Sequence, residues 1–238
     1  ELQPHDPELA TLLSGDTATI EIRLADVLYQ QGKTEAAIRA YGEILERRPN
    51  EIPILQKLAH IYYNQGAKES ALKLYQDMAR LVPNQTEVHH RLAQIYNALG
   101  RKKEEKETYR QVVEINPNDA RAWKALGNLA YQGGDLKGAI VAYQRVVQLS
   151  SRDHSVLNNL AYLLTQQNRP IEAVPLYRQS IGLAPKNLKT YLALGLALEK
   201  SGQITEAVAV YRRLLELDGQ NTEAQKQIRA LLSGPATP

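Results

Sequence analysis

The sequence predicts an all-α protein built from six helical hairpins that stack against one another. Three observations predict it: tyrosines recur every 34 residues, a leucine followed by a small residue lies 17 residues before each tyrosine, and glycine or proline falls where helices should end. The tyrosines are Tyr41, Tyr75, Tyr109, Tyr143, Tyr177 and Tyr211. The leucines are Leu24, Leu58, Leu92, Leu126, Leu160 and Leu194. No insertion interrupts the spacing, so we expect six units at 18–51, 52–85, 86–119, 120–153, 154–187 and 188–221.

Each unit, numbered from its first residue as position 1, predicts two helices. Apolar or small residues at positions 3, 7, 8, 10 and 11 form the stripe of the first helix, and positions 20, 24, 27 and 28 form that of the second. Glycine at position 15 permits a positive φ where the first helix ends, and proline at position 32 ends the second. Small residues at positions 8 and 20 allow close approach. One hairpin cannot bury both of its faces, so neighbouring hairpins must stack.

The two ends of the chain do not repeat. Residues 1–17 form an N-terminal extension, either a short helix that starts at Asp6 or a linker that continues something upstream. Residues 222–232 predict a capping helix, because Thr222 and Gln225 have capping-box spacing and a single apolar stripe follows. Residues 233–238 are expected to be a flexible tail.

The 34-residue period, the small residue after each leucine, the alanine at position 20 and the proline at position 32 resemble the tetratricopeptide repeat (TPR) family. The segment from Trp123 to Tyr131 is similar to the signature first helix of that family. The resemblance implies a right-handed α–α superhelix, a TPR solenoid. It also implies a generic binding scaffold whose partner the fold does not identify.

Two departures from the repeat pattern lie in the second helices. Glu105 stands at position 20 of the third unit, where the other units have alanine. It is either a switchable buried carboxylate or a sign of a locally loosened hairpin whose charge reaches solvent. The second interpretation is favoured, because lone buried acids are rare. Pro175 lies within the second helix of the fifth unit, where we expect one lost hydrogen bond and a small kink.

The sequence contains none of the motifs that carry catalysis. It has no phosphate-binding loop, no GxSxG, no HExxH and no cysteine, so thiolate chemistry and disulfides are excluded. His60, His89 and His90 cluster, but no carboxylate at suitable spacing completes a metal site. We therefore expect neither enzymatic activity, nor a cofactor, nor a metal. The net charge of +3 does not favour nucleic-acid binding, and no apolar run is long enough to span a membrane.

By the family resemblance, positions 2, 5, 6, 9, 12 and 13 of the first helices line a concave groove. These positions carry seven basic and three acidic residues, so the groove should be basic and attract acidic partners. The candidate groove residues are Arg23, Tyr29, Lys57, His60, Tyr63, Arg91, Arg121, Lys124, Asn128, Tyr131, Asn159, Tyr162, Lys189, Leu192 and Leu196. His90, at position 5 of the third unit, is expected to face the same groove.

Three patterns stand out among the groove positions. Arg23, Lys57 and Arg91 share position 6 and predict a basic ladder flanked by tyrosines. A second set resembles the clamp with which chaperone-adaptor TPR domains hold a C-terminal carboxylate, although Ala193 replaces its fifth member and the asparagines also suit peptide backbone. The set comprises Lys124, Asn128, Asn159 and Lys189. The third is an apolar patch of Tyr162, Leu192 and Leu196, which either a partner or the chain's own C-terminal helix or tail covers.

These patterns favour a non-catalytic scaffold or adaptor, in the assembly of a larger complex, that binds an acidic or C-terminal peptide or an amphipathic helix of a protein partner. The alternatives are a homo-oligomeric assembly module, an RNA-binding helical repeat, and a regulatory TPR domain cut from a larger protein. A cytoplasmic location is favoured. A periplasmic or membrane-anchored protein stays open, because the chain starts at Glu1 and an upstream segment is not visible.

Overall fold

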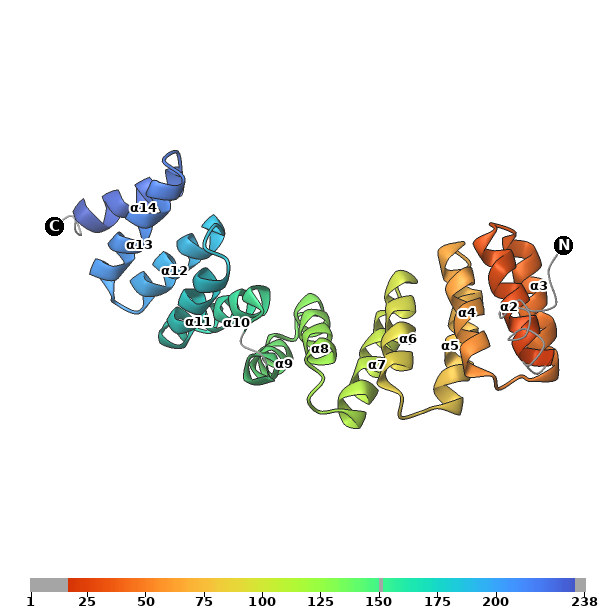
Figure 1. Cartoon of the computed structure of the whole chain (residues 1–238). Coiled ribbons are helices and arrows are strands. Elements are labelled where there is room, and N and C mark those ends of the chain that lie inside the picture. The colour runs from red at the N-terminus through yellow and green to blue at the C-terminus, as the bar shows by residue number, and fades with distance from the viewer. Residues whose placement is uncertain (1–16, 150–151, 234–238) are drawn as a thin grey trace, which may run out of the picture. The chain divides into compact units, whose positions relative to one another are not determined.

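The computed structural model describes residues 17–149 and 152–233 (Figure 1). These residues form thirteen α-helices and no strand, so the predicted all-α class is confirmed. The chain divides into two compact units, Glu1–Asn116 and Pro117–Pro238, and each is described by itself. The predictions for residues 1–16 and 234–238 lie outside the described residues.

The first unit consists of three hairpins in which each helix packs on the next along the chain. Its helices are α2 (Thr17–Gln30), α3 (Thr34–Arg47), α4 (Ile52–Asn64), α5 (Lys68–Leu81), α6 (Thr86–Ala98) and α7 (Lys102–Ile115). The second helix of a hairpin also packs on the first helix of the next hairpin, as α3 does on α4 and α5 on α6. The hairpins therefore share a core and do not stand alone.

The second unit repeats this arrangement and ends on a single helix. Its helices are α8 (Ala120–Gln132), α9 (Leu136–Leu149), α10 (His154–Gln166), α11 (Pro170–Leu183), α12 (Leu188–Lys200), α13 (Ile204–Leu217) and α14 (Thr222–Ser233). The last helix packs on α13, where Ala224 is fully buried and Ile228 and Leu231 pack against the core. An unpaired helix at this end gives the final hairpin a cover for its apolar face.

Small residues let the two helices of each hairpin meet closely. Ala25 at position 8 and Ala37 at position 20 are fully buried in the first hairpin, and alanines at these positions recur buried along both units. Gly127 shows how tight the contact is, because a Cβ added there would lie 2.6 Å from Cε1 of Tyr143. The tyrosine ring at position 24 thus occupies the space that a side chain at position 8 would need.

The turn inside each hairpin needs a left-handed residue, as the glycines predicted. Gly66 has a φ of 80°, and the amide that follows it, of Ala67, donates to the carbonyl of Tyr62. In the fifth repeat Asn168 takes the left-handed conformation instead, with a φ of 58°. Asparagine is the residue that tolerates this region best after glycine.

A contact between successive repeats explains the polar and aromatic residues at position 4. His89 Nε2 lies 2.7 Å from the carbonyl oxygen of Pro83, and Trp123 Nε1 donates to that of Pro117 at 2.9 Å. The Tyr191 hydroxyl donates to the carbonyl of Pro185 in the same way. Each side chain thus holds the start of one repeat to the end of the repeat before it.

The favoured interpretation of Glu105 is wrong, because its charge does not reach solvent. The residue is only 4% exposed. Its carboxylate accepts hydrogen bonds from Asn97 Nδ2 at 2.7 Å and from Lys102 Nζ at 3.1 Å. The hairpin therefore keeps a buried carboxylate at a position that usually holds alanine, and two polar neighbours compensate for its burial.

Pro175 does not end its helix. The helix α11 begins with Pro170 and continues through Pro175 to Leu183. Proline has no amide hydrogen, so Pro175 cannot donate the helical hydrogen bond to the carbonyl of Ile171. Both residues are exposed. The missing hydrogen bond thus falls on the side of the helix that faces water.

Candidate functional site: the faces of the first helices

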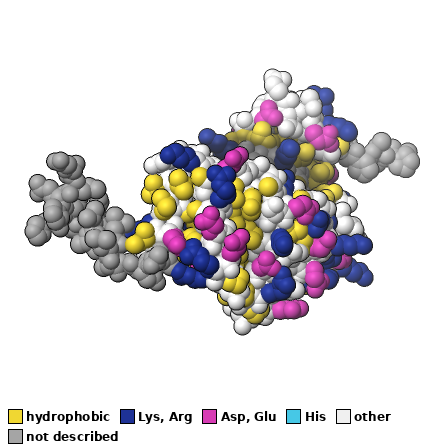
Figure 2. Space-filling view, turned by 90° about the vertical axis from the view of Figure 1, so that its right-hand side faces the viewer, with side chains coloured by type: hydrophobic (Ala, Val, Ile, Leu, Met, Phe, Trp, Pro, Cys, Tyr) yellow, Lys and Arg dark blue, Asp and Glu magenta, His cyan; other side chains and the backbone are white. Residues whose placement is uncertain are grey.

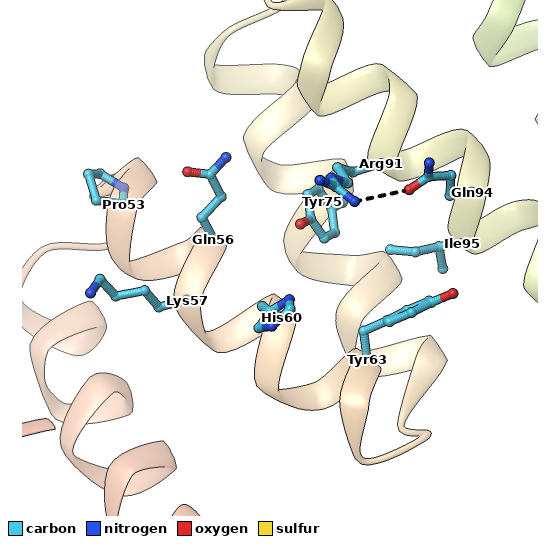
Figure 3. Close-up of a pocket in the computed structure, with 9 residues that line it drawn as sticks. All are labelled: Pro53, Gln56, Lys57, His60, Tyr63, Tyr75, Arg91, Gln94 and Ile95. Atoms are coloured by element: carbon cyan, nitrogen blue, oxygen red, sulfur yellow. Dashed lines mark hydrogen bonds between the residues drawn. The ribbon is translucent and has the colours of Figure 1, made fainter. Parts of the chain in front are cut away.

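A cavity of about 430 Å³ lies in the first unit between α4 and α6 (Figure 3). Its lining comprises Pro53, Gln56, Lys57, His60, Tyr63, Tyr75, Arg91, Gln94 and Ile95. Four of the α4 residues share one helical face, because Pro53 is followed after three and four residues by Gln56 and Lys57, and Lys57 after three residues by His60. The structure therefore brings together four of the predicted site residues: Lys57, His60, Tyr63 and Arg91.

Two residues of this cavity were not predicted from the sequence. Tyr75, from α5, and Ile95, from α6, stand at positions 24 and 10, which the repeat pattern assigns to the core. Both are indeed buried, yet they form part of the cavity wall. Periodicity separates core from surface but does not show where the core is open to a cavity.

The predicted basic ladder is largely neutralised by acidic neighbours. Lys57 Nζ lies 2.5 Å from Asp26 Oδ1, and Arg91 Nε lies 3.1 Å from Glu87 Oε1. Arg23 is exposed and forms no ion pair with another described residue. Two of the three cations therefore have a carboxylate partner on the same surface, so this part of the groove attracts anions less than a count of basic residues suggests.

Asp26 links the first two repeats. It accepts hydrogen bonds from the Tyr41 hydroxyl and from Lys57 Nζ. Burial raises the pKa of the Tyr41 phenol, and the hydrogen bond to Asp26 raises it further. A second cavity, of about 390 Å³, is lined by Asp26, Tyr29, Gln30, Tyr41, Lys57, His60 and Ile61. The predicted site residue Tyr29 thus lies near Lys57 and His60.

The three clustered histidines have separate environments. His60 is exposed and its Nε2 lies 3.0 Å from Asn64 Nδ2. His90 is only 2% exposed, and its ring meets the edge of Tyr109 at a centroid distance of 5.8 Å. The expectation that His90 faces the groove is therefore wrong, because it packs toward α7. Among the described residues no group of three or more potential ligands could hold a metal ion.

In the second unit three of the four clamp-like residues are engaged within the protein. Lys124 Nζ lies 2.7 Å from Asp153 Oδ2. Asp153 caps α10 by accepting from the amides of Ser155 and Val156. Burial raises the pKa of Asp153, but the hydrogen bonds from Lys124, Ser155 and Val156 outweigh burial and lower that pKa to about 2.

The two clamp-like asparagines meet at a tyrosine hydroxyl. Tyr143 donates to Asn128 Oδ1 at 2.8 Å, and Asn159 Nδ2 lies 3.5 Å from the same hydroxyl oxygen. Lys189, the fourth member, is exposed. The carboxylate clamp thus stays a prediction, and a ligand would have to compete with these internal bonds.

The predicted apolar patch is partly open. Tyr162, on α10, and Leu196, on α12, are exposed, whereas Leu192 is half-buried and packs against the core. The terminal helix α14 packs on α13. It leaves Leu196 uncovered, so it does not supply the cover for this patch.

Exposed tyrosines in the described part of the chain lie on first helices: Tyr63 on α4, Tyr131 on α8 and Tyr162 on α10. The basic residues Arg121 and Lys189 are also exposed on first helices of the second unit. Residues 117–238 hold 14 basic and 9 acidic residues, whereas residues 1–116 hold 15 basic and 17 acidic. The positive charge of the chain is therefore a property of its second unit.

Comparisons with known proteins identify the repeat. The family model described as the cilia and flagella-associated protein 70 C-terminal domain matches residues 51–234, and one described as tetratricopeptide repeat matches residues 22–51. No curated protein matches the sequence. None of the described helices is long and apolar enough to cross a membrane.

Solved structures of similar fold confirm the predicted fold class. The chain is similar to YrrB, described as a TPR protein with an unusual peptide-binding site, at 15% identity and a TM-score of 0.65, over 80% of this chain and 98% of YrrB. It is similar to MamA at 22% identity and a TM-score of 0.61, over 72% of this chain and 94% of MamA. The PilF protein of Pseudomonas aeruginosa is 18% identical with a TM-score of 0.58, over 88% and 95% of the two chains.

Proposed function

We propose that this chain, which belongs to the tetratricopeptide repeat family, is a non-catalytic scaffold. It holds a segment of a partner protein on its first helices. The observation that carries the proposal is the set of exposed tyrosines Tyr63, Tyr131 and Tyr162, all on first helices. Tyrosine is enriched where proteins bind other proteins, because its ring is apolar and its hydroxyl is polar. YrrB, whose fold is similar, is described as having a peptide-binding site.

The partner segment is an acidic or C-terminal peptide, or an amphipathic helix with an acidic face, and its anionic groups contact the second unit. That unit carries the excess of basic residues, and Arg121 and Lys189 are exposed on its first helices, as are Asn159, Tyr162 and Leu196. An aliphatic side chain of the partner would cover Leu196, and a carboxylate would approach Lys189. In the first unit Lys57 and Arg91 already have acidic partners, so charge contributes less there.

The test is a selection of phage-displayed peptides against the full chain, followed by affinity measurements on the selected peptides with two variants. Leu196→Asp places a charge on an exposed apolar site of a first helix, and Val141→Asp does the same on the second helix α9. We expect Leu196→Asp to weaken binding at least tenfold and Val141→Asp to leave it unchanged. Equal effects of the two variants, or selection of no peptide, would contradict the proposal.

Self-assembly is a second candidate, and the exposed face of α2 favours it. Ile20, Leu24 and Val27 are exposed, and Leu24 reaches 57%, whereas the equivalent α4 residues Ile54, Leu58 and Ile61 are buried. Figure 2 looks on to the end of the chain that carries α2 and α3 and shows hydrophobic side chains grouped among charged ones. If copies associate through this face, molar mass by light scattering will rise with concentration and Leu24→Glu will abolish the rise. A constant molar mass would exclude this candidate.

A further inference from the structure

A tyrosine hydroxyl that forms no hydrogen bond with another described residue opens on to the cavity between α4 and α6. The hydroxyls of Tyr41, Tyr143 and Tyr211 each donate to a side chain on the first helix of their own repeat, namely Asp26, Asn128 and Glu199. Tyr75 is the equivalent residue of the second repeat and is only 7% exposed. Its hydroxyl forms no hydrogen bond with another described residue, and burial raises the pKa of its phenol.

The neighbours of Tyr75 explain why its hydroxyl is left without an acceptor. Position 9, which supplies Asp26 and Asn128 to their tyrosines, holds His60 in this repeat, and His60 pairs with Asn64 along α4. Arg91 across the cavity can only donate, and it is directed to Glu87 and to Gln94 Oε1. The Tyr75 hydroxyl is open to the cavity, because the described buried polar atoms without a partner do not include it. A carbonyl supplied by a ligand in the cavity would therefore accept its hydrogen bond in place of water.

The rest of the cavity indicates the chemistry of that ligand. Figure 3 shows Tyr75 between the facing sides of α4 and α6, with Ile95 and Tyr63 beside each other at one end of the cavity. The side-chain amide of Gln56, on the α4 wall, forms no hydrogen bond with another described residue. These groups offer an apolar wall, a hydroxyl donor and a free amide, which suit an aliphatic side chain and a peptide backbone.

The charges of the cavity favour an uncharged ligand. Each cation on its wall has a carboxylate partner: Lys57 has Asp26 and Arg91 has Glu87. A carboxylate ligand would have to displace one of these acids from its partner, whereas a backbone carbonyl would not. Neutral acceptors therefore match this cavity better than anionic ones.

We infer that this cavity binds an uncharged, extended segment of the partner protein. One aliphatic side chain of the segment packs against Ile95 and Tyr63, a backbone carbonyl accepts the hydrogen bond of the Tyr75 hydroxyl, and the Gln56 amide pairs with the adjacent peptide group. The inference rests on the proposed scaffold function and adds to it that the first unit recognises its ligand through hydrogen bonds and apolar contact. Its recognition is then independent of salt, unlike that of an acidic segment on the second unit.

The experiment titrates capped pentapeptides into the full chain and follows isotope-labelled isoleucine and leucine methyl groups by NMR. The probe is acetyl-Gly-Ser-Leu-Ser-Gly-amide, compared with the same peptide carrying Asp or Lys at the centre. We expect the Leu peptide to shift the Ile95 methyl signals, with equal affinity at low and at physiological salt. Tyr75→Phe should weaken its binding about five- to tenfold, the equivalent of one neutral hydrogen bond. The matched control, Tyr143→Phe, removes a hydroxyl that is already bonded to Asn128 and should leave this affinity unchanged.

Three results would overturn the inference: tighter, salt-dependent binding of the Asp peptide at Ile95, equal affinities of Tyr75→Phe and the parent chain, or no shift at Ile95. If the Ile95 signals stay unmoved while phage-selected peptides shift the Leu196 methyls, the cavity assignment fails and the scaffold function stands. If neither the pentapeptides nor the selection yields binding anywhere, both proposals fail.

Discussion

The tyrosine at position 24 acts through both its ring and its hydroxyl. The ring packs beneath the small residue at position 8, as the distance from Gly127 to Tyr143 shows, and the hydroxyl reaches polar residues of the first helix. Six of the 13 tyrosines of the chain stand at this position, and this double use favours tyrosine over phenylalanine there. Where position 9 offers an acceptor the hydroxyl binds within the protein, and at Tyr75 it faces a cavity.

Removing the hydroxyl should therefore cost stability at one tyrosine and not at another. We predict that Tyr143→Phe lowers the free energy of unfolding by about 1 kcal/mol, because Asn128 loses its hydrogen-bond donor. Tyr75→Phe should change it by less than about 0.5 kcal/mol, because that hydroxyl has no partner among the described residues. Urea unfolding of both variants measures the difference, and equal losses would show that the hydrogen bond has been assigned wrongly.

Within each hairpin, two helices approach closely only where the facing residue is small. A Cβ at Gly127 would overlap the Tyr143 ring, whereas one at Gly42, inside α3, would meet nothing within 4 Å. We predict that Gly127→Ala destabilises the protein by about 1–3 kcal/mol through overpacking. Gly42→Ala should instead stabilise it by about 0.5–1 kcal/mol, because alanine favours a helix interior. Thermal unfolding gives both signs, and a stabilising Gly127→Ala would disprove the close contact.

The N-terminus of α10 makes the stability of the second unit depend on pH. The pKa of Asp153 is about 2 in the folded chain, below its ordinary value near 3.8. A depressed pKa means that the carboxylate stabilises the fold above the ordinary value and loses that effect as pH falls from about 4 to about 2. We predict that the parent chain is more stable than Asp153→Asn at pH 6.

Most of that advantage should be lost by about pH 2, since about half of the parent carboxyls are then protonated. Urea titrations of the two chains at a series of pH values measure it. Lys124→Met, which removes the cation 2.7 Å away, should reduce the advantage at pH 6. A difference between parent and Asp153→Asn that stays constant from pH 6 to pH 2 would mean that the carboxylate does not act through its charge.

At the scale of the whole molecule, the fold could be predicted from the sequence because the same residue pattern recurs in each repeat. Leucine recurs at its position in all six repeats, and alanine, glycine and proline recur at theirs in most of them, so single departures such as Pro175 did not obscure the hairpins. The inner surface was harder to predict. The sequence placed Lys57 and Arg91 at the same position of their repeats. Their ion pairs with Asp26 and Glu87 depend on side-chain conformations, which periodicity does not determine.

Residue type and repeat position also fail to predict burial at single positions. His90 and Glu105 look like surface residues by type, yet both are buried, because neighbours such as Tyr109 and Lys102 accommodate them. Tyr75 looks like a core residue by position, yet it borders a cavity. A signal was present for Tyr75: position 9 of its repeat holds histidine in place of the acid or amide found at Asp26 and Asn128.

The claim that the first helices hold the partner can be tested most directly by site-specific photo-crosslinking. The photoreactive residue p-benzoylphenylalanine would replace Tyr63, Tyr131 or Tyr162 on the first helices, and Val141 or Ile171 on the second helices, all of which are exposed. Each variant is irradiated with a phage-selected peptide and the products are identified by mass spectrometry. The account predicts crosslinks from the three tyrosine positions and none from Val141 or Ile171. Crosslinks of equal yield from the second helices, or only from them, would contradict it.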